Sequence, residues 1–192
     1  MSTLLSNIEK NMKGLSFSHI GIYVKDLEKM EDFYTNVLNF FVTDRGNLDT
    51  PRGTVQLVFL SRDPKTHHQI VLASGRPEEN IFNPINQISL EADSLETLQE
   101  LFLNFKALNV PNIDAITHGN AISFYAPDPE GNRLELFIDT PWYVSQPMKV
   151  PLDLTLDAQK IMSIVEDHAR ELPGFCPRAE WEGRMQQLMS AS

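Results

Sequence analysis

Cysteine and long apolar runs are almost absent from this sequence, and both absences narrow the class of protein. The single cysteine, Cys176, cannot form a disulfide within the chain or supply a zinc site built from several thiolates. No apolar run approaches the roughly 18 residues that a transmembrane helix needs, and the first residues lack the basic start and apolar stretch of a signal peptide. We therefore expect a cytoplasmic protein with no membrane partner, whose metal ligands, if it has any, are His, Asp, Glu or amide groups.

Positive charge is also scarce. The 192 residues include 16 Lys and Arg against 26 Asp and Glu, which gives a formal net charge of -10, and the basic residues form no cluster. Such a chain repels phosphate backbones and anionic lipid surfaces, so nucleic acid is not an expected partner. With 42% hydrophobic and 22% charged residues, the composition is typical of a globular protein.

Two segments of the chain share one pattern, residues 17–28 and residues 85–96. Each begins with alternating apolar residues typical of a strand, followed by Asp26 or Ser94 at an N-cap position. In each, a helix is then predicted by apolar residues at i, i+3 and i+4 spacing. These apolar residues are Leu27, Met30, Phe33, Tyr34, Val37 and Leu38 in the first copy and Leu95, Leu98, Leu101, Phe102 and Phe105 in the second.

Three strand-like runs follow each predicted helix, so the repeated unit is βαβββ. The runs are Phe40–Thr43, Thr54–Ser61 and His68–Ala73 in the first copy and Ile113–Ile116, Ala121–Tyr125 and Arg133–Ile138 in the second. We therefore predict modules at 17–74 and 85–140, joined by a linker at Gly75–Asn80 and preceded by a terminal segment at 1–16. Residues 141–192 are rich in proline and have helical spacing at Asp157–Leu172 and Arg178–Met189. This extension is predicted to fold over the core or over a partner chain.

One acidic residue lies in an unusual position. Glu135 is flanked by Leu134, Leu136 and Phe137 in a predicted strand. Burying a carboxylate is costly unless it is paired or bound to a cation. The period of two in a strand also allows the leucines to face the core while Glu135 faces water. Both interpretations stay open from the sequence.

The chain resembles the vicinal oxygen chelate superfamily over about Phe17–Thr140. The resemblance rests on the paired βαβββ units, on His19-Ile20-Gly21, and on the turn Asp128–Asn132 that precedes Glu135. It implies an α+β fold in which two βαβββ modules form a curved mixed sheet around a metal cavity. A narrower similarity, to the catalytic domain of type I extradiol catechol dioxygenases, comes from further residues read together. They are Phe59-Leu60-Ser61, His67-His68-Gln69, His118, and Tyr125 ten residues before Glu135.

This resemblance implies a role for each of several residues. It assigns His19, Gln87 and Glu135 as metal ligands, although the dioxygenases have histidine where this chain has Gln87. It also assigns His68 as an acid/base group, with His67 as the fallback. His118 would bind a substrate hydroxyl. Tyr125 would hydrogen-bond the substrate.

The expected function is therefore a metal-dependent dioxygenase that cleaves a small aromatic diol with O2, in a chain that forms a homodimer or remains a monomer. Fe(II) is the first candidate metal, with Mn(II), Zn(II) or Ni(II) as others, because an amide is a weaker ligand for Fe(II) than imidazole. Two alternatives remain. One is a glyoxalase-like metal-dependent lyase or isomerase, and the other is a metal-free small-molecule binding protein of the same fold.

Overall fold

A computed structural model describes residues 16–51, 53–79 and 83–191. The first group of elements is β1 (Ile20–Val24), α1 (Leu27–Asn36), β2 (Phe41–Thr50), β3 (Gly53–Ser61) and β4 (Ile70–Ser74). The second is β5 (Ile88–Glu91), α2 (Leu95–Ala107), β6 (Asp114–Thr117), β7 (Ala121–Pro127) and β8 (Arg133–Asp139). The third is β9 (Trp142–Tyr143), β10 (Val150–Pro151), α3 (Ala158–Arg170), β11 (Cys176–Pro177) and α4 (Arg178–Ala191). Residues 1–15 of the predicted terminal segment and Asn80 of the predicted linker lie outside the described residues.

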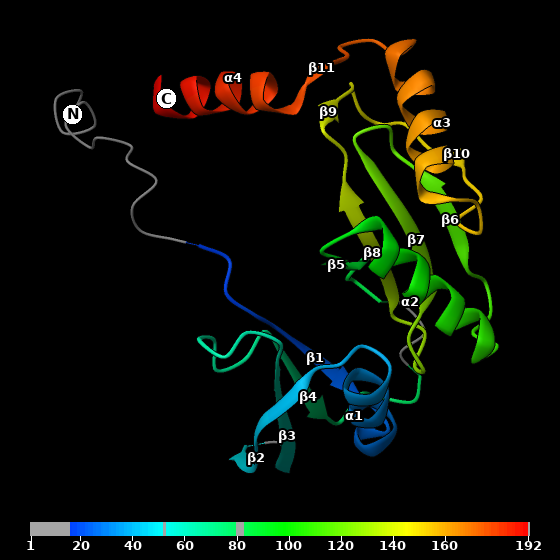
Figure 1. The fold of residues 1–192 in the computed structure, drawn as a ribbon. Helices are drawn as coiled ribbons and strands as arrows, with labels where there is room; N and C mark the ends of the chain where they lie inside the picture. The colour runs from blue at the N-terminus through cyan, green and yellow to red at the C-terminus, as the bar shows by residue number, and fades with distance from the viewer. Residues whose placement is uncertain (1–15, 52, 80–82, 192) are drawn as a thin grey trace, which may run out of the picture.

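Two sheets of mixed strand direction form the body of the molecule (Figure 1). The first has the strand order β1-β4-β3-β2, with β1 parallel to β4 and the other pairs antiparallel. The second has the order β10-β6-β7-β8-β5, with β5 parallel to β8. Each of the first two groups is thus a βαβββ unit. The prediction of an α+β fold with two such units is confirmed.

Both module helices begin where the sequence places an N-cap. The Asp26 carboxylate accepts a hydrogen bond of 3.0 Å from the backbone N–H of Lys29. The Ser94 hydroxyl accepts one of 3.1 Å from the backbone N–H of Thr97. These bonds satisfy backbone donors that the first turn of a helix leaves unpaired. The two helices therefore start at equivalent points of the repeat.

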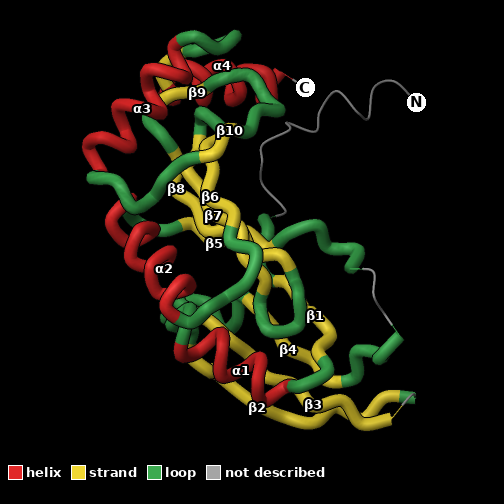
Figure 2. The backbone as a smooth tube through the Cα atoms, turned by 90° about the vertical axis from the view of Figure 1, so that its right-hand side faces the viewer, coloured by secondary structure: helices red, strands yellow, loops and turns green. Residues whose placement is uncertain are grey.

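Helices α1, α2 and α3 lie along one side of the two sheets (Figure 2). The core lies between helices and strands, and Phe105 links its parts by edge contacts with Phe33 and Phe124 at centroid distances of 5.9 and 5.4 Å. Side chains alternate along a strand, so Ile22 of β1 is buried while Tyr23 is exposed. Ile22 thus belongs to the core, whereas Tyr23 lies on the opposite face of the first sheet.

The turn between β7 and β8 joins the second module to the first. The Glu130 carboxylate accepts hydrogen bonds from the backbone N–H groups of Lys25 and Asp26, at 2.6 and 2.8 Å. Within the turn, the Asp128 carboxylate accepts from the backbone N–H of Asn132 at 2.9 Å, and Gly131 has a φ of 80°. Glycine tolerates this left-handed conformation without steric cost. The turn thereby fixes the register of the β7–β8 hairpin.

The C-terminal extension packs in two different ways. Strand β10 adds an edge to the second sheet, and α3 buries Ile161, Val165 and Ala169 in the core. Helix α4 projects away from the module helices (Figure 1), and its Trp181 ring stacks on Tyr143 with a centroid distance of 5.2 Å. In the described ranges, no helix has the length and apolar character that crossing a membrane requires.

Most strand ends differ from the predicted ones by one or two residues, and two of the differences matter for the architecture and the site. Strand β2 continues to Thr50 instead of Thr43, because its pairing with β3 runs to Gly53. Strand β4 starts at Ile70, so His68 precedes the strand and does not lie on it. The cause is a turn in which the Thr66 N–H donates to the Asp63 carbonyl, which delays the return of the chain to the sheet.

Candidate active site

Three neighbouring strands bring polar side chains together on the face of the second sheet that lies opposite Leu134 and Leu136. In the register of the sheet, Glu135 on β8 lies opposite Tyr125 on β7 and Ser89 on β5. Paired residues of adjacent strands direct their side chains to the same face. Glu135 is only 8% exposed, because Leu134 and Leu136 cover the helix side and these polar neighbours cover the other. Of the two interpretations left by the sequence, the buried carboxylate is the one observed.

Four hydrogen bonds satisfy the Glu135 carboxylate. Its Oε2 accepts from Gln87 Nε2 and from Ser89 Oγ, both at 2.6 Å. Its Oε1 accepts from the Tyr125 hydroxyl at 2.7 Å and from Ser123 Oγ at 3.1 Å. An ionised carboxylate has about four acceptor positions, so all of them meet donors here.

These donors hold Glu135 in its charged form. Burial alone would raise the pKa of Glu135, because it disfavours the charged form. The nearby His118 imidazole, together with the hydrogen bonds from Ser89, Tyr125 and Ser123, outweighs burial and lowers the pKa of Glu135 to about 2. The site therefore contains a buried anion over the whole physiological pH range.

His118 extends this network. Its Nδ1 lies 2.6 Å from the carbonyl oxygen of Met148, which can only accept, so Nδ1 carries a hydrogen. Its Nε2 lies 3.0 Å from the Tyr125 hydroxyl and 3.7 Å from Glu135 Oε1. When the Tyr125 hydroxyl donates to Glu135, Nε2 must donate to Tyr125, and the imidazole is then a cation. The Glu135 carboxylate, followed by the Met148 carbonyl, raises the pKa of His118 accordingly.

A second cluster, of three histidines, lies on the first module. His19 directly precedes β1 and His68 precedes β4, and their ring centroids are 4.3 Å apart. The Nδ1 atoms of His67 and His68 are 2.8 Å apart, and the Phe59 ring contacts both imidazoles. Burial, with smaller contributions from His19 and His67, lowers the pKa of His68. His68 is thus biased toward the neutral imidazole.

The six residues predicted from the resemblance therefore form two groups. Gln87, Glu135, Tyr125 and His118 are hydrogen-bonded to one another in the second module. His19 and His68 contact each other in the first module. Across the described part of the chain, no group of three or more His, Cys, Asp or Glu side chains is arranged to hold a metal ion.

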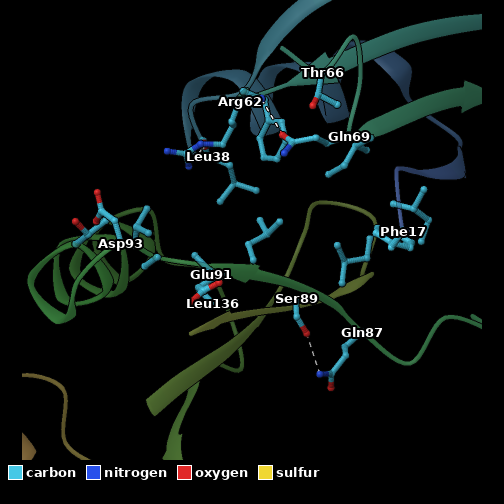
Figure 3. Close-up of a pocket in the computed structure, with 18 of the residues that line it drawn as sticks. Phe17, Leu38, Arg62, Thr66, Gln69, Gln87, Ser89, Glu91, Asp93 and Leu136 are labelled. Atoms are coloured by element: carbon cyan, nitrogen blue, oxygen red, sulfur yellow. Dashed lines mark hydrogen bonds between the residues drawn. The ribbon is translucent and has the colours of Figure 1, made fainter. Parts of the chain in front are cut away.

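A cavity of about 820 Å³ lies between the two modules and reaches the Glu135 network (Figure 3). Gln87 and Ser89 line one side of it, and Figure 3 shows the hydrogen bond between them. Apolar side chains from both modules, including Ile20 and Leu136, line the cavity as well. This volume lies in the range of about 300–1,000 Å³ typical of small-molecule sites.

Two donors of the network were not predicted from the sequence. Ser89 lies two residues after Gln87, and Ser123 lies two residues before Tyr125. The period of two along a strand was the available signal, because it places each serine on the same face as a predicted site residue. Serine is too common in strands and turns for this spacing to stand out alone.

Comparison with known proteins identifies the family. The family model described as "Glyoxalase/Bleomycin resistance protein/Dioxygenase superfamily" matches residues 16–136. The chain is 28% identical over 127 residues to biphenyl-2,3-diol 1,2-dioxygenase 2 of Rhodococcus globerulus, an alignment that covers 64% of this chain and 62% of the relative. It is 29% identical over 131 residues to metapyrocatechase of Pseudomonas sp. (strain CF600), covering 67% of this chain and 40% of the relative. The chain thus spans less than two thirds of the length of either relative.

A solved structure shows the same fold. The glyoxylase/bleomycin resistance protein/dioxygenase domain from Frankia sp. EAN1pec superposes with a TM-score of 0.54 at 19% identity, covering 66% of this chain and 100% of that one. The family match, over residues 16–136, spans both βαβββ modules up to the middle of β8. The chain belongs to the glyoxalase/bleomycin resistance protein/dioxygenase superfamily.

Proposed function

We propose that this chain is a metal-dependent ring-cleaving dioxygenase of the extradiol type, acting on a small catecholic substrate with O2. The names of the two relatives, a biphenyl-2,3-diol 1,2-dioxygenase and a metapyrocatechase, support this class of reaction. The observation that carries the proposal is the buried, ionised Glu135, in contact with Gln87 and joined through Tyr125 to His118. A buried acidic group with a strongly lowered pKa is a candidate for function, and two of its hydrogen-bond partners, Gln87 and Ser89, line the cavity.

Glu135, Gln87 and His19 would hold the metal. Their chemistry fits a divalent cation, because carboxylate, amide and imidazole are all ligands of first-row metals. The contact between Gln87 and Glu135 supports a shared role for these two donors. His19 is the outlying member, since its contacts are with Ser18 and His68. A cation on Glu135 would compete with the four hydrogen bonds that now satisfy the carboxylate.

A divalent metal bound there would stabilise the negative charge of a deprotonated diol and bring O2 to it. The protein side chains have separate tasks. His68, biased to its neutral form, would accept a proton from a substrate hydroxyl. His118 and Tyr125 would hold a substrate oxygen, because His118 carries a hydrogen on Nδ1 and uses Nε2 toward the site.

Metal analysis tests the ligand assignment. The protein is loaded anaerobically with Fe(II), Mn(II), Zn(II) or Ni(II), and bound metal is measured after removal of the excess. We expect one metal per chain in the wild type and almost none in Glu135→Gln, which lacks the anionic donor. Glu100→Gln is the matched control, because Glu100 is exposed on α2. Full metal occupancy in Glu135→Gln would contradict the assignment.

One observation favours a second candidate, a glyoxalase-like lyase or isomerase. Gln87 supplies an amide where the dioxygenase resemblance implies imidazole, and an amide is the weaker ligand for Fe(II). Such an enzyme moves a proton within its substrate and consumes no oxygen. Metal binding without O2 uptake in the presence of catechols would favour this candidate, and absence of metal binding would favour a metal-free binding protein.

A further inference from the structure

One loop of the C-terminal extension lies against the turn between β6 and β7. This segment, residues 144–149, connects β9 to β10 and is the β9–β10 loop. Directly after it, Val150 of β10 pairs with Thr117, the last residue of β6. Shortly before it, the Trp142 ring donates a hydrogen bond of 2.7 Å from Nε1 to the carbonyl of Gly119. Both ends of the loop are therefore fixed beside this turn.

The Gln146 side chain ties the middle of the β9–β10 loop to the same turn. Its Nε2 donates hydrogen bonds to the His118 carbonyl at 2.7 Å and to Asn120 Oδ1 at 3.0 Å. Its Oε1 accepts a hydrogen bond of 3.1 Å from the backbone N–H of Met148. A side-chain amide has two N–H donors and one carbonyl acceptor, so all three groups of Gln146 are used. Gln146 is exposed, so these hydrogen bonds, and not burial in the core, hold its side chain in place.

This arrangement positions the Met148 carbonyl against the His118 imidazole. The carbonyl lies between two fixed points of the chain, the Met148 N–H bound to Gln146 and Val150 paired with β6. It accepts from His118 Nδ1 at 2.6 Å, while the opposite ring nitrogen, Nε2, lies 3.0 Å from the Tyr125 hydroxyl. The hydrogen bond at one imidazole nitrogen determines which nitrogen is protonated and how the other is presented. The loop therefore sets the tautomer and the orientation of His118.

We propose that Gln146 is a positioning residue for His118, because it holds the Met148 carbonyl against Nδ1 and so keeps Nε2 directed into the site. Every residue has a backbone carbonyl, so the place of residue 148 matters here, and Gln146 is the side chain that fixes this place. The inference rests on the proposed function, in which His118 binds a substrate oxygen. Gln146 and Met148 lie beyond residue 136, where the family match ends. The C-terminal extension thus contributes to the site itself.

NMR of the metal-free protein with ¹⁵N-labelled histidine tests the positioning directly. Wild type, Gln146→Met and Gln159→Met are compared above the pH at which His118 becomes neutral, and His118→Gln identifies the signals of this residue. Gln146→Met keeps the length of the side chain and removes its three hydrogen bonds. Gln159→Met is the matched control, because Gln159 is exposed in the first turn of α3. The ¹⁵N shift distinguishes a protonated ring nitrogen from a bare one. We expect the hydrogen on Nδ1 alone in wild type and control, and a mixture of both tautomers in Gln146→Met.

Anaerobic titration of catechol into the Zn(II)-loaded proteins tests the consequence for the site. Gln146→Met should bind catechol about tenfold more weakly than the wild type, which corresponds to about 1.4 kcal/mol, the size of one hydrogen bond. Its Zn(II) content should equal that of the wild type, because Gln146 contacts no proposed metal ligand. The control should match the wild type in both measurements. A merely structural defect would lower metal content and catechol affinity together.

The two measurements fail separately. A single Nδ1–H tautomer in Gln146→Met, or a hydrogen on Nε2 alone in the wild type, would overturn the role of Gln146. Unchanged catechol affinity in Gln146→Met, or an equal loss of Zn(II) binding, would overturn it as well. A tautomer change in Gln146→Met, with a wild type that binds neither Zn(II) nor catechol, would support the positioning of His118 and contradict the dioxygenase.

Discussion

Glu135 should make the stability of this protein depend on pH in a way that one substitution removes. Its pKa is lowered from an ordinary value of 4.5 to about 2 in the folded chain. A carboxyl group with a lowered folded-state pKa stabilises the fold above its unfolded pKa, and this contribution is lost as the pH falls toward the folded value. The stabilisation is therefore complete above about pH 5 and disappears between about pH 4.5 and 2.

The magnitude follows from the difference in pKa. At about 1.4 kcal/mol per pKa unit, a difference of about 2.5 corresponds to about 3 kcal/mol. About 2 kcal/mol of this should already be lost at pH 3. The Glu135 side chain is only 10% exposed, so solvent screening reduces the value little. A contribution of this size is a substantial part of the roughly 5–15 kcal/mol by which domains are stable.

Urea unfolding of the metal-free wild type, Glu135→Gln and Glu100→Gln between pH 7 and pH 3 tests this expectation. Glu135→Gln should be less stable than the wild type by about 3 kcal/mol at pH 7, because its amide cannot accept from all four donors. The difference should shrink to about 1 kcal/mol at pH 3, where the wild-type carboxylate has lost most of its contribution. Glu100→Gln should follow the wild type throughout. A stability difference between wild type and Glu135→Gln that is constant with pH would refute the reasoning.

Three further substitutions have expected outcomes. Gln87→His should raise Fe(II) affinity in an anaerobic titration, because imidazole is the better donor; equal or weaker affinity in the folded variant would mean that the third ligand lies elsewhere. His68→Ala should lower kcat by about 10²–10⁴-fold with metal content unchanged, as for other acid/base groups, and a loss below twofold would contradict its role. Tyr125→Phe should change the pKa of His118, measured by NMR titration, because the hydroxyl that links His118 Nε2 to Glu135 is removed. An unchanged pKa would show that this hydroxyl does not couple the charges of His118 and Glu135.

The sequence predicted the fold because its local signals agree with one another. The caps at Asp26 and Ser94 and the turn at Asp128–Asn132 define the ends of elements whose apolar periods are clear. That turn also sets the hairpin register, so Tyr125 and Glu135 are brought together by local chemistry. Contacts between residues of one such hairpin can therefore be predicted from the sequence.

Other features depend on packing that no local pattern encodes. Ser89 approaches Glu135 through the pairing of β5 with β8, which joins distant segments. The Arg133 guanidinium contacts the Tyr125 ring of the neighbouring strand, a contact that the local sequence pattern does not indicate. The predicted ligand set of His19, Gln87 and Glu135 stays a prediction, because it requires two modules to converge and the sequence of each module specifies only its own sheet.

Isotope labelling of the product tests the central claim, dioxygenase chemistry at Glu135, most directly. The Fe(II)-loaded protein is supplied with catechol or 3,4-dihydroxybenzoate under ¹⁸O₂, and the product is analysed by mass spectrometry. The account predicts a ring-opened product that contains both atoms of one O2 molecule, formed by the wild type and by Glu100→Gln and not by Glu135→Gln. Recovery of the diol unchanged from a wild-type protein with bound Fe(II), or equal product from Glu135→Gln, would contradict it.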